Sequence, residues 1–449
     1  MQGITLTIAI IISLLAVSLR PSYALAAYII GLLWYPSYLV VSIGTIDISV
    51  GRIVVSVLLL RCLCDDRIRN KFTWSRLDTW VTFSIAVYVV TTCITQSLST
   101  AIENRGGFVM DTWFTYMVTR FIVTDKRTLV TLIKCIGIVL VPLAILGAIE
   151  SVTGWMPFQP LQRFCPWYAG RYGGPIDVEE LRWGLSRAVG PFNHSILFGG
   201  SFTMFLPLIY YLRHEKNQWH VLSYIISGVV IIGALSSMSS GPWVMVIVVI
   251  ICLAMENYKL WVKPLSIFFL LSCIFTAIAS NRPFYHVLAS YANPLGGDGW
   301  HRARLIDVAI EHFSEWWLIG YGNEDPGWGP YLGMVHTDLT NEFIATGVRY
   351  GILGIIALCA VLTIAFLMLG RTYKKMENIE LKSMCWSLGS ILFAVIVTWM
   401  SVSFFGQLVS LFYCILGIIG SFPYLVLRNY ESVFQKQDYP LLMYYPEAR

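Results

Sequence analysis

Residues 336–370 read HTDLTNEFIATGVRYGILGIIALCAVLTIAFLMLG, a polar stretch followed at once by an apolar one. The apolar part, 350–370, contains no charged side chain. It is long enough for a helix that crosses the hydrocarbon core of a bilayer, which takes about 20 residues. The polar part carries titratable and amide side chains from His336 to Glu342. This segment therefore predicts a polar site held against a membrane-spanning helix.

The composition of the whole chain supports the same class of protein. Its 449 residues are 57% hydrophobic and only 13% charged, and the mean hydropathy is +0.67. A soluble domain carries about 25% charged residues, so the composition excludes a soluble protein. The net charge of +5 is modest and does not predict binding to nucleic acid. The fold class that we expect is an all-α polytopic integral membrane protein.

Apolar runs along the chain predict about 12–14 transmembrane helices. The first run has no basic segment before it and no small-residue cleavage site after it, so we expect a retained span rather than a signal peptide. The runs lie at 4–19, 23–43, 46–60, 79–96, 108–124, 128–150, 191–212, 221–238, 241–256, 260–280, 350–370, 384–404 and 407–427.

Positive charge orients these runs. The interval 61–78 is rich in Arg and Lys, which places it and the alternate short loops in the cytoplasm. Both long loops then face outside. The predicted organisation is N-terminal spans in 1–150, an outer loop in 151–190, central spans in 191–280, a large outer loop in 281–349, C-terminal spans in 350–427 and a cytoplasmic tail in 428–449.

The large outer loop contains amphipathic segments. Apolar residues recur at helical spacing from Arg302 to Trp317, which predicts a helix packed on the membrane or on the spans. Thr337 or Asp338 can cap a second helix. His336 would then stand at the N-terminus of that helix, where the dipole disfavours the protonated imidazole. The neutral form can act as a base.

The other outer loop, 151–190, combines aromatic side chains with Pro and Gly, which argues against one long helix. Its aromatic side chains can lie at the membrane interface or stack on the apolar faces of sugar rings. Both interpretations stay open at this point.

Four segments, in this order, resemble those of the O-antigen ligase and Wzy-type polysaccharide polymerase superfamily. The likeness covers order, spacing and topology over about 185–370, whereas the earlier spans match only as apolar helices. The segments are RAVGPFNH at 187–194, the Ser/Gly turn at 236–241, RARLIDVAIEHFSEWW at 302–317 followed by LIGYG, and HTDLTNEF at 336–343 followed by GVRYGILG at 347–354. The family often has His-Asn at 336–337 and Ser-Arg at 240–241, where this chain has His-Thr and Ser-Gly.

The resemblance implies a GT-C-like bundle and a metal-independent membrane glycosyltransferase without a cofactor. Its donor would be an oligosaccharide on undecaprenyl diphosphate, used at the outer face of the bacterial cytoplasmic membrane. A polymerase passes the growing chain to the next lipid-linked repeat unit, and a ligase passes it to lipid A-core. We favour the polymerase, because nothing in the sequence identifies a lipid A-core acceptor. A flippase and a chain-length regulator are the implied protein partners.

A lipid diphosphate gains negative charge as it leaves. Without a metal, fixed cations must stabilise that charge. Arginine suits this role because it is always charged and binds phosphate through two N–H groups. Each arginine can instead be an interfacial anchor or an ion-pair partner. The candidate substrate-binding residues lie on outer segments near the spans; they are Arg187, Arg302, Arg304, Arg282, Asn193 and Asn341, with Arg349 as an alternate.

The acceptor hydroxyl needs a base, a role that typically contributes about 10²–10⁴-fold in rate. His336 is the first choice for it. Asp338 or Glu342 can orient the imidazole or take the base role. A helix-capping, purely structural role is the alternative for His336, and the competing histidines are His194, His301 and His312.

A transporter or flippase is the rival from another class of protein. Transporters keep polar groups at the middle of the bilayer, often in related repeats. Here the apolar runs hold few charges, such as Asp47 and Lys134, and the polar groups gather in one outer loop. The sequence therefore favours the enzyme.

Overall fold

The apolar segment 350–370 lies in the longest of the described helices, α16 (Glu342–Lys375). The computed structural model describes residues 1–165, 181–281, 283, 285–287 and 299–435. Asn341 begins α16, because its side-chain oxygen accepts the N–H groups of Phe343 and Ile344. The prediction that Thr337 or Asp338 caps a helix here is wrong; no residue from 333 to 340 is helical.

Eight of the described helices are long and apolar enough to cross a membrane, judged by length and composition. This is compatible with a multi-pass α-helical membrane protein, as the sequence predicts. They are α5 (Arg76–Thr95), α8 (Lys126–Thr153), α9 (Ser195–Tyr211), α10 (Trp219–Ser236), α12 (Lys259–Ala279), α16, α17 (Ile379–Trp399) and α18 (Gln407–Gln435).

Shorter elements complete the bundle. Apolar but shorter helices are α1 (Gln2–Ser18), α2 (Pro21–Trp34) and α11 (Ser240–Met255). The others are α3 (Val50–Cys64), α4 (Asp66–Arg69), α6 (Leu98–Val109), the π-helix η1 (Met110–Phe114), α7 (Thr115–Ile122) and the 3₁₀ turns η2 (Gln159–Phe164) and η3 (Leu212–His214).

A β-hairpin interrupts two of the predicted spans. Strands β1 (Val40–Ile43) and β2 (Ile46–Ser49) pair antiparallel. The connection includes Gly44 at φ 64°, a conformation that glycine adopts without steric cost. The predicted runs 23–43 and 46–60 are therefore helical only to Trp34 and from Val50, because the β-branched residues between them pair as strands.

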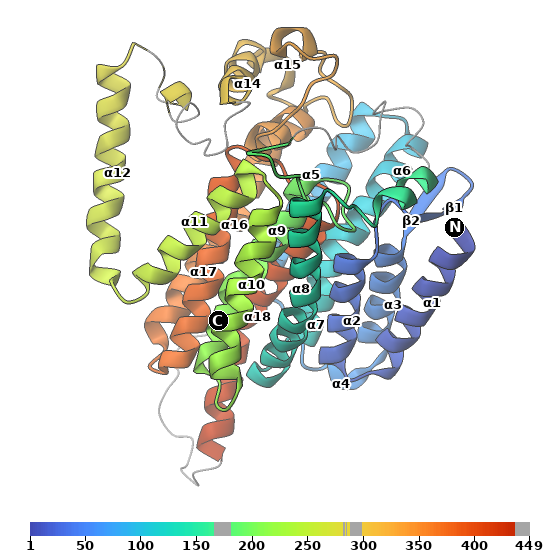
Figure 1. Ribbon diagram of the computed structural model, residues 1–449, viewed down its shortest axis with the longest axis vertical. Helices are drawn as coiled ribbons and strands as arrows, with labels where there is room; N and C mark the ends of the chain where they lie inside the picture. Colours follow the sequence, from blue (N-terminus) through green and yellow to red (C-terminus); the bar gives the residue numbers. More distant parts are fainter. Residues whose placement is uncertain (166–180, 282, 284, 288–298, 436–449) are drawn as a thin grey trace.

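The helices stand side by side, and the elements of 281–349, which we call the outer loop after its predicted side, gather at one end of them (Figure 1). Helices α14 (Gly299–Glu311) and α15 (Phe313–Trp316) lie at this end and largely confirm the predicted amphipathic helix 302–317. They have a small apolar core of their own, in which Leu305 and Trp316 meet Val348 of α16. Helix α12 stands apart from the bundle in the same view, and none of its residues is buried.

Helix α16 is kinked at Gly351, and segment 317–322 of the outer loop supplies hydrogen-bond partners for the backbone groups at the kink. Gly351 has φ 70° and ψ −171° inside the helix. The backbone N–H of Ile352 donates to the carbonyl of Trp317 at 2.7 Å, and the N–H of Tyr321 donates to the carbonyl of Val348 at 2.7 Å. Backbone groups released by the kink are thus satisfied by segment 317–322. This exchange fixes the outer loop on α16.

We predict that Gly351→Ala destabilises the protein by more than about 1 kcal/mol. A Cβ at this position would lie 2.3 Å from the carbonyl oxygen of Leu318, in a left-handed conformation. Gly370→Ala is the matched control in the same helix, since a Cβ there meets nothing within 4 Å. It should be neutral or stabilising by up to about 1 kcal/mol. Thermal unfolding of the purified protein measures both, and equal unfolding midpoints would contradict the docking role of the kink.

Candidate functional site

The buried carboxylate of Glu150 anchors the segment that carries Arg187. Glu150, in the last turn of α8, is 1% exposed. Its Oε2 accepts the backbone N–H groups of Val189 at 2.9 Å and Gly190 at 2.8 Å. The N–H of Ala188 donates to the carbonyl of Ser236 at 3.1 Å. The chain from 187 to 190 is therefore fixed between α8 and the end of α10.

The turn between α10 and α11 faces this segment. Met238 adopts φ 44° in the turn, a left-handed conformation that costs a non-glycine residue roughly 1–3 kcal/mol. The surrounding packing holds it there, since Met238 is 3% exposed. As a result Ser239 and Ser240 stand at the start of α11.

Two of the predicted binding arginines converge on these serines. The Nη2 group of Arg187 donates to Ser239 Oγ at 3.0 Å, and that of Arg302 donates to Ser240 Oγ at 3.1 Å. Arg302 comes from α14 in the large outer loop. Because the serines are consecutive, the two guanidinium groups are brought to one turn. We call Arg187, Arg302, Ser239 and Ser240 the arginine cluster.

His194 lies beside this cluster, at the N-terminus of α9. Its Nδ1 accepts the backbone N–H of Ile196 at 3.1 Å, so the proton of the neutral ring sits on Nε2. Burial, together with the positive charges of Arg187 and Arg182, lowers the pKa of His194 to about 4. The imidazole is therefore neutral at pH 7 and can exchange a proton only through Nε2.

Arg304 lies elsewhere on α14. It follows Arg302 by two residues, which turns its side chain about 200° around the helix. It pairs with Glu311 at 2.9 Å and lies 3.9 Å from Asp307. The structure therefore does not bring Arg304 to the arginine cluster, and its charge is already balanced on its own helix.

His336 is found in an exposed loop rather than at the helix N-terminus that the sequence predicts. Its side chain is 78% exposed, and its Nδ1 lies 3.7 Å from Asp325 Oδ2. Partial burial would raise the pKa of Asp325, but hydrogen bonds from Thr337 and Gly327 and the nearby His336 prevail and lower it. An ionised carboxylate thus stands beside the imidazole. The catalytic role of His336 stays a prediction.

Asn341 and Glu342 hold the connection between α17 and α18. The amide nitrogen of Asn341 donates to the carbonyl of Met400 at 3.0 Å. Glu342 Oε2 accepts the N–H of Phe404 at 2.9 Å. The next residue, Phe405, places its ring 5.9 Å from that of His194. These two predicted site residues therefore shape the connection 400–406, which reaches the neighbourhood of the arginine cluster.

The other candidates are scattered. Asp338 is exposed in the outer loop. Asn193 precedes His194 and has a buried Oδ1 without a hydrogen-bond partner among the described residues. His301 is 5% exposed on α14, whereas His312 stacks on Trp328 with ring centroids 5.6 Å apart. Arg282 lies outside the described residues, as do the aromatic residues of loop 151–190 within 166–180.

Sequence reasoning missed Glu150 and the serine pair. Glu150 had one visible signal, which is a lone carboxylate at the end of the apolar run 128–150; charged residues at such places are costly and are retained for a purpose. Ser239 and Ser240 had no signal beyond their place in the turn.

Comparison with known proteins adds no family: no protein-family model matches this chain, and no curated protein does. Within the described ranges, no group of three or more His, Cys, Asp or Glu side chains is arranged to hold a metal ion.

We predict that His194→Asn reduces the loss of stability between pH 6.5 and pH 4. The folded pKa of about 4 lies below the ordinary value of 6.5. Unfolded chains therefore bind the proton first as the pH falls, and the stabilisation that is complete above pH 6.5 is lost toward pH 4. Asparagine keeps the helix cap and removes this titration. Unfolding midpoints across this pH range measure the effect.

His194→Ala is the control for the cap. It should be less stable by about 1 kcal/mol at every pH but share the flatter pH dependence of the asparagine variant. An unchanged slope in both variants would show that His194 titrates normally.

Proposed function

We propose that this protein polymerises undecaprenyl-diphosphate-linked oligosaccharide repeat units into a surface polysaccharide, such as O-antigen, capsule or exopolysaccharide, at the outer face of the cytoplasmic membrane. The observation that carries the proposal is the convergence of Arg187 and Arg302 on Ser239 and Ser240. Two guanidinium groups at one turn suit a diphosphate, because a guanidinium is always charged and its planar N–H groups match phosphate oxygens.

In the proposed reaction the bond between the sugar anomeric carbon and the diphosphate oxygen breaks, and the acceptor oxygen bonds to that carbon. The diphosphate leaves with its negative charge, which the arginine cluster stabilises. Fixed cations do this well, since they need no rearrangement as the charge develops. The acceptor hydroxyl gives its proton to a base.

His336 is the base that we propose, with Asp325 beside it to hold the imidazole. It is exposed on the outer loop, where a second lipid-linked glycan can approach. Glu342 is the alternative, although its Oε2 is engaged by the N–H of Phe404. Polymerase and ligase share this chemistry and differ in the acceptor.

We expect Arg187→Gln and Arg302→Gln each to reduce polymer formation by about 10²-fold or more. Glutamine keeps a hydrogen bond to the neighbouring serine and removes the charge. Arg304→Gln is the matched control, because the charge of Arg304 is balanced by Glu311. The measurement is the surface polysaccharide ladder on a gel, with the membrane abundance of each variant determined in parallel.

The ladder also separates the rival functions. Collapse to a single repeat on its carrier supports the polymerase. A full ladder that stays on undecaprenyl diphosphate and never reaches lipid A-core identifies a ligase. An unchanged ladder in the Arg187 and Arg302 variants, at normal abundance, overturns the proposed site and favours a transporter or flippase.

We further predict that His336→Ala lowers the polymerisation rate by about 10²-fold or more without lowering stability, since the side chain is 78% exposed. Glu342→Gln, compared in parallel, should chiefly loosen the connection 400–406. A large loss of rate in Glu342→Gln with normal stability, and none in His336→Ala, would assign the base to Glu342 instead.

A further inference from the structure

Gln407, the first residue of α18, carries a buried amide without an internal partner. The residue is 3% exposed, and neither Nε2 nor Oε1 has a hydrogen-bond partner among the described residues. A buried polar group that stays unpaired costs about 1–3 kcal/mol. This amide therefore points to a bound group that both accepts and donates a hydrogen bond.

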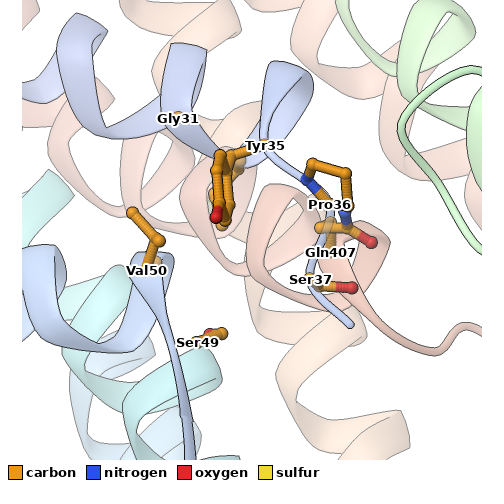
Figure 2. A pocket seen from close by; sticks show the side chains of 9 residues that line it. Gly31, Tyr35, Pro36, Ser37, Ser49, Val50 and Gln407 are labelled. Carbon is orange, nitrogen blue, oxygen red and sulfur yellow. The ribbon is translucent and has the colours of Figure 1, made fainter. Parts of the chain in front are cut away.

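The amide lines a small pocket between the end of α2 and the start of α3 (Figure 2), which also includes Tyr35, Ser37 and Ser49. Its volume is about 10 Å³, which is close to what one oxygen-sized group needs. Ser37 and Ser49 are half-buried, so the pocket is reached from the surface. Figure 2 shows the Gln407 amide beside Pro36.

The pocket is electrically neutral. None of the residues that line it is charged. The nearest charge on the adjoining helix is Arg52, whose backbone N–H donates to Ser49 Oγ. Its guanidinium is already paired with Asp111 of the π-helix η1 at 2.8 Å. In the part of the chain that the structure describes, no cation lines the pocket to pair with a phosphate or carboxylate, whereas a hydroxyl matches an amide as both donor and acceptor.

The pocket is connected to the arginine cluster through the chain. Phe405, whose ring lies 5.9 Å from that of His194, precedes Gln407 by two residues. Two residues span at most about 7 Å. Gln407 is therefore close to the residue that contacts His194, and His194 lies beside the arginine cluster.

We propose that the Gln407 pocket binds a hydroxyl group of a neutral sugar in the lipid-linked glycan. This inference rests on the proposed function, since the diphosphate of the same ligand is assigned to Arg187 and Arg302. The amide then serves to position the glycan and takes no part in the bond-breaking step.

The test compares two ligands on the full chain in lipid nanodiscs. One is the undecaprenyl-diphosphate-linked oligosaccharide extracted from the producing cells, and the other is undecaprenyl diphosphate without sugar. We expect Gln407→Leu to weaken binding of the first about tenfold and to leave binding of the second unchanged. Gln218→Leu is the matched control, because Gln218 is exposed before α10 and should change neither affinity.

Each other outcome overturns the proposal in a distinct way. If Gln407→Leu binds each ligand as tightly as the wild-type protein does, the pocket holds only water or bilayer lipid. The proposed function then stands. An equal loss for both ligands, or a lowered unfolding midpoint, assigns Gln407 to the fold. Failure of the wild-type protein to bind either ligand overturns the proposed function and this subsite together.

Discussion

Backbone polar groups that leave regular structure near a bilayer must be satisfied within the protein, and this constraint determines where irregular segments of this chain lie. Hydrocarbon offers no hydrogen bonds, so an unpaired N–H or C=O there costs several kcal/mol. The carboxylate of Glu150 takes the N–H groups of Val189 and Gly190. Segment 317–322 takes those released by the kink at Gly351. These hydrogen bonds fix both irregular segments in place.

The arginine cluster is a consequence of these two anchors. Arg187 stands on the segment that Glu150 holds, and Arg302 stands on α14, which packs on α16 through the small core next to the kink. The two arginines are far apart in sequence and reach one turn only because both anchors are in place. Charges held in this way need no rearrangement when a negative charge develops near them. The anchored backbone thus fixes the positions of the two guanidinium charges.

The parts of the fold that depend on local properties were predictable, and the parts that depend on distant contacts were not. The apolar runs of α9 and α16 are long and carry no Asp, Glu, Lys or Arg, so their helices follow from composition alone. The hairpin at 40–49 was misread, because an apolar run does not by itself distinguish strand from helix. The predicted helix N-terminus at His336 is wrong, because the helix begins later in the sequence, where Asn341 caps it. Nothing in the local sequence predicts the contact between Arg187 and Ser239.

Under the proposed function, the connection 400–406 and the first residue of α18 join two kinds of recognition that a lipid-linked glycan needs. Phe405 places its ring near that of His194, beside two guanidinium groups, and two residues later the neutral amide of Gln407 faces its pocket. Charged donors hold a diphosphate strongly but do not distinguish one glycan from another. An amide adds little affinity, yet it rejects a ligand that lacks the matching hydroxyl, because the buried amide is then left unpaired. Asn341 and Glu342 hydrogen-bond to this connection, so the same helix that docks segment 317–322 also holds the chain that leads to both kinds of site.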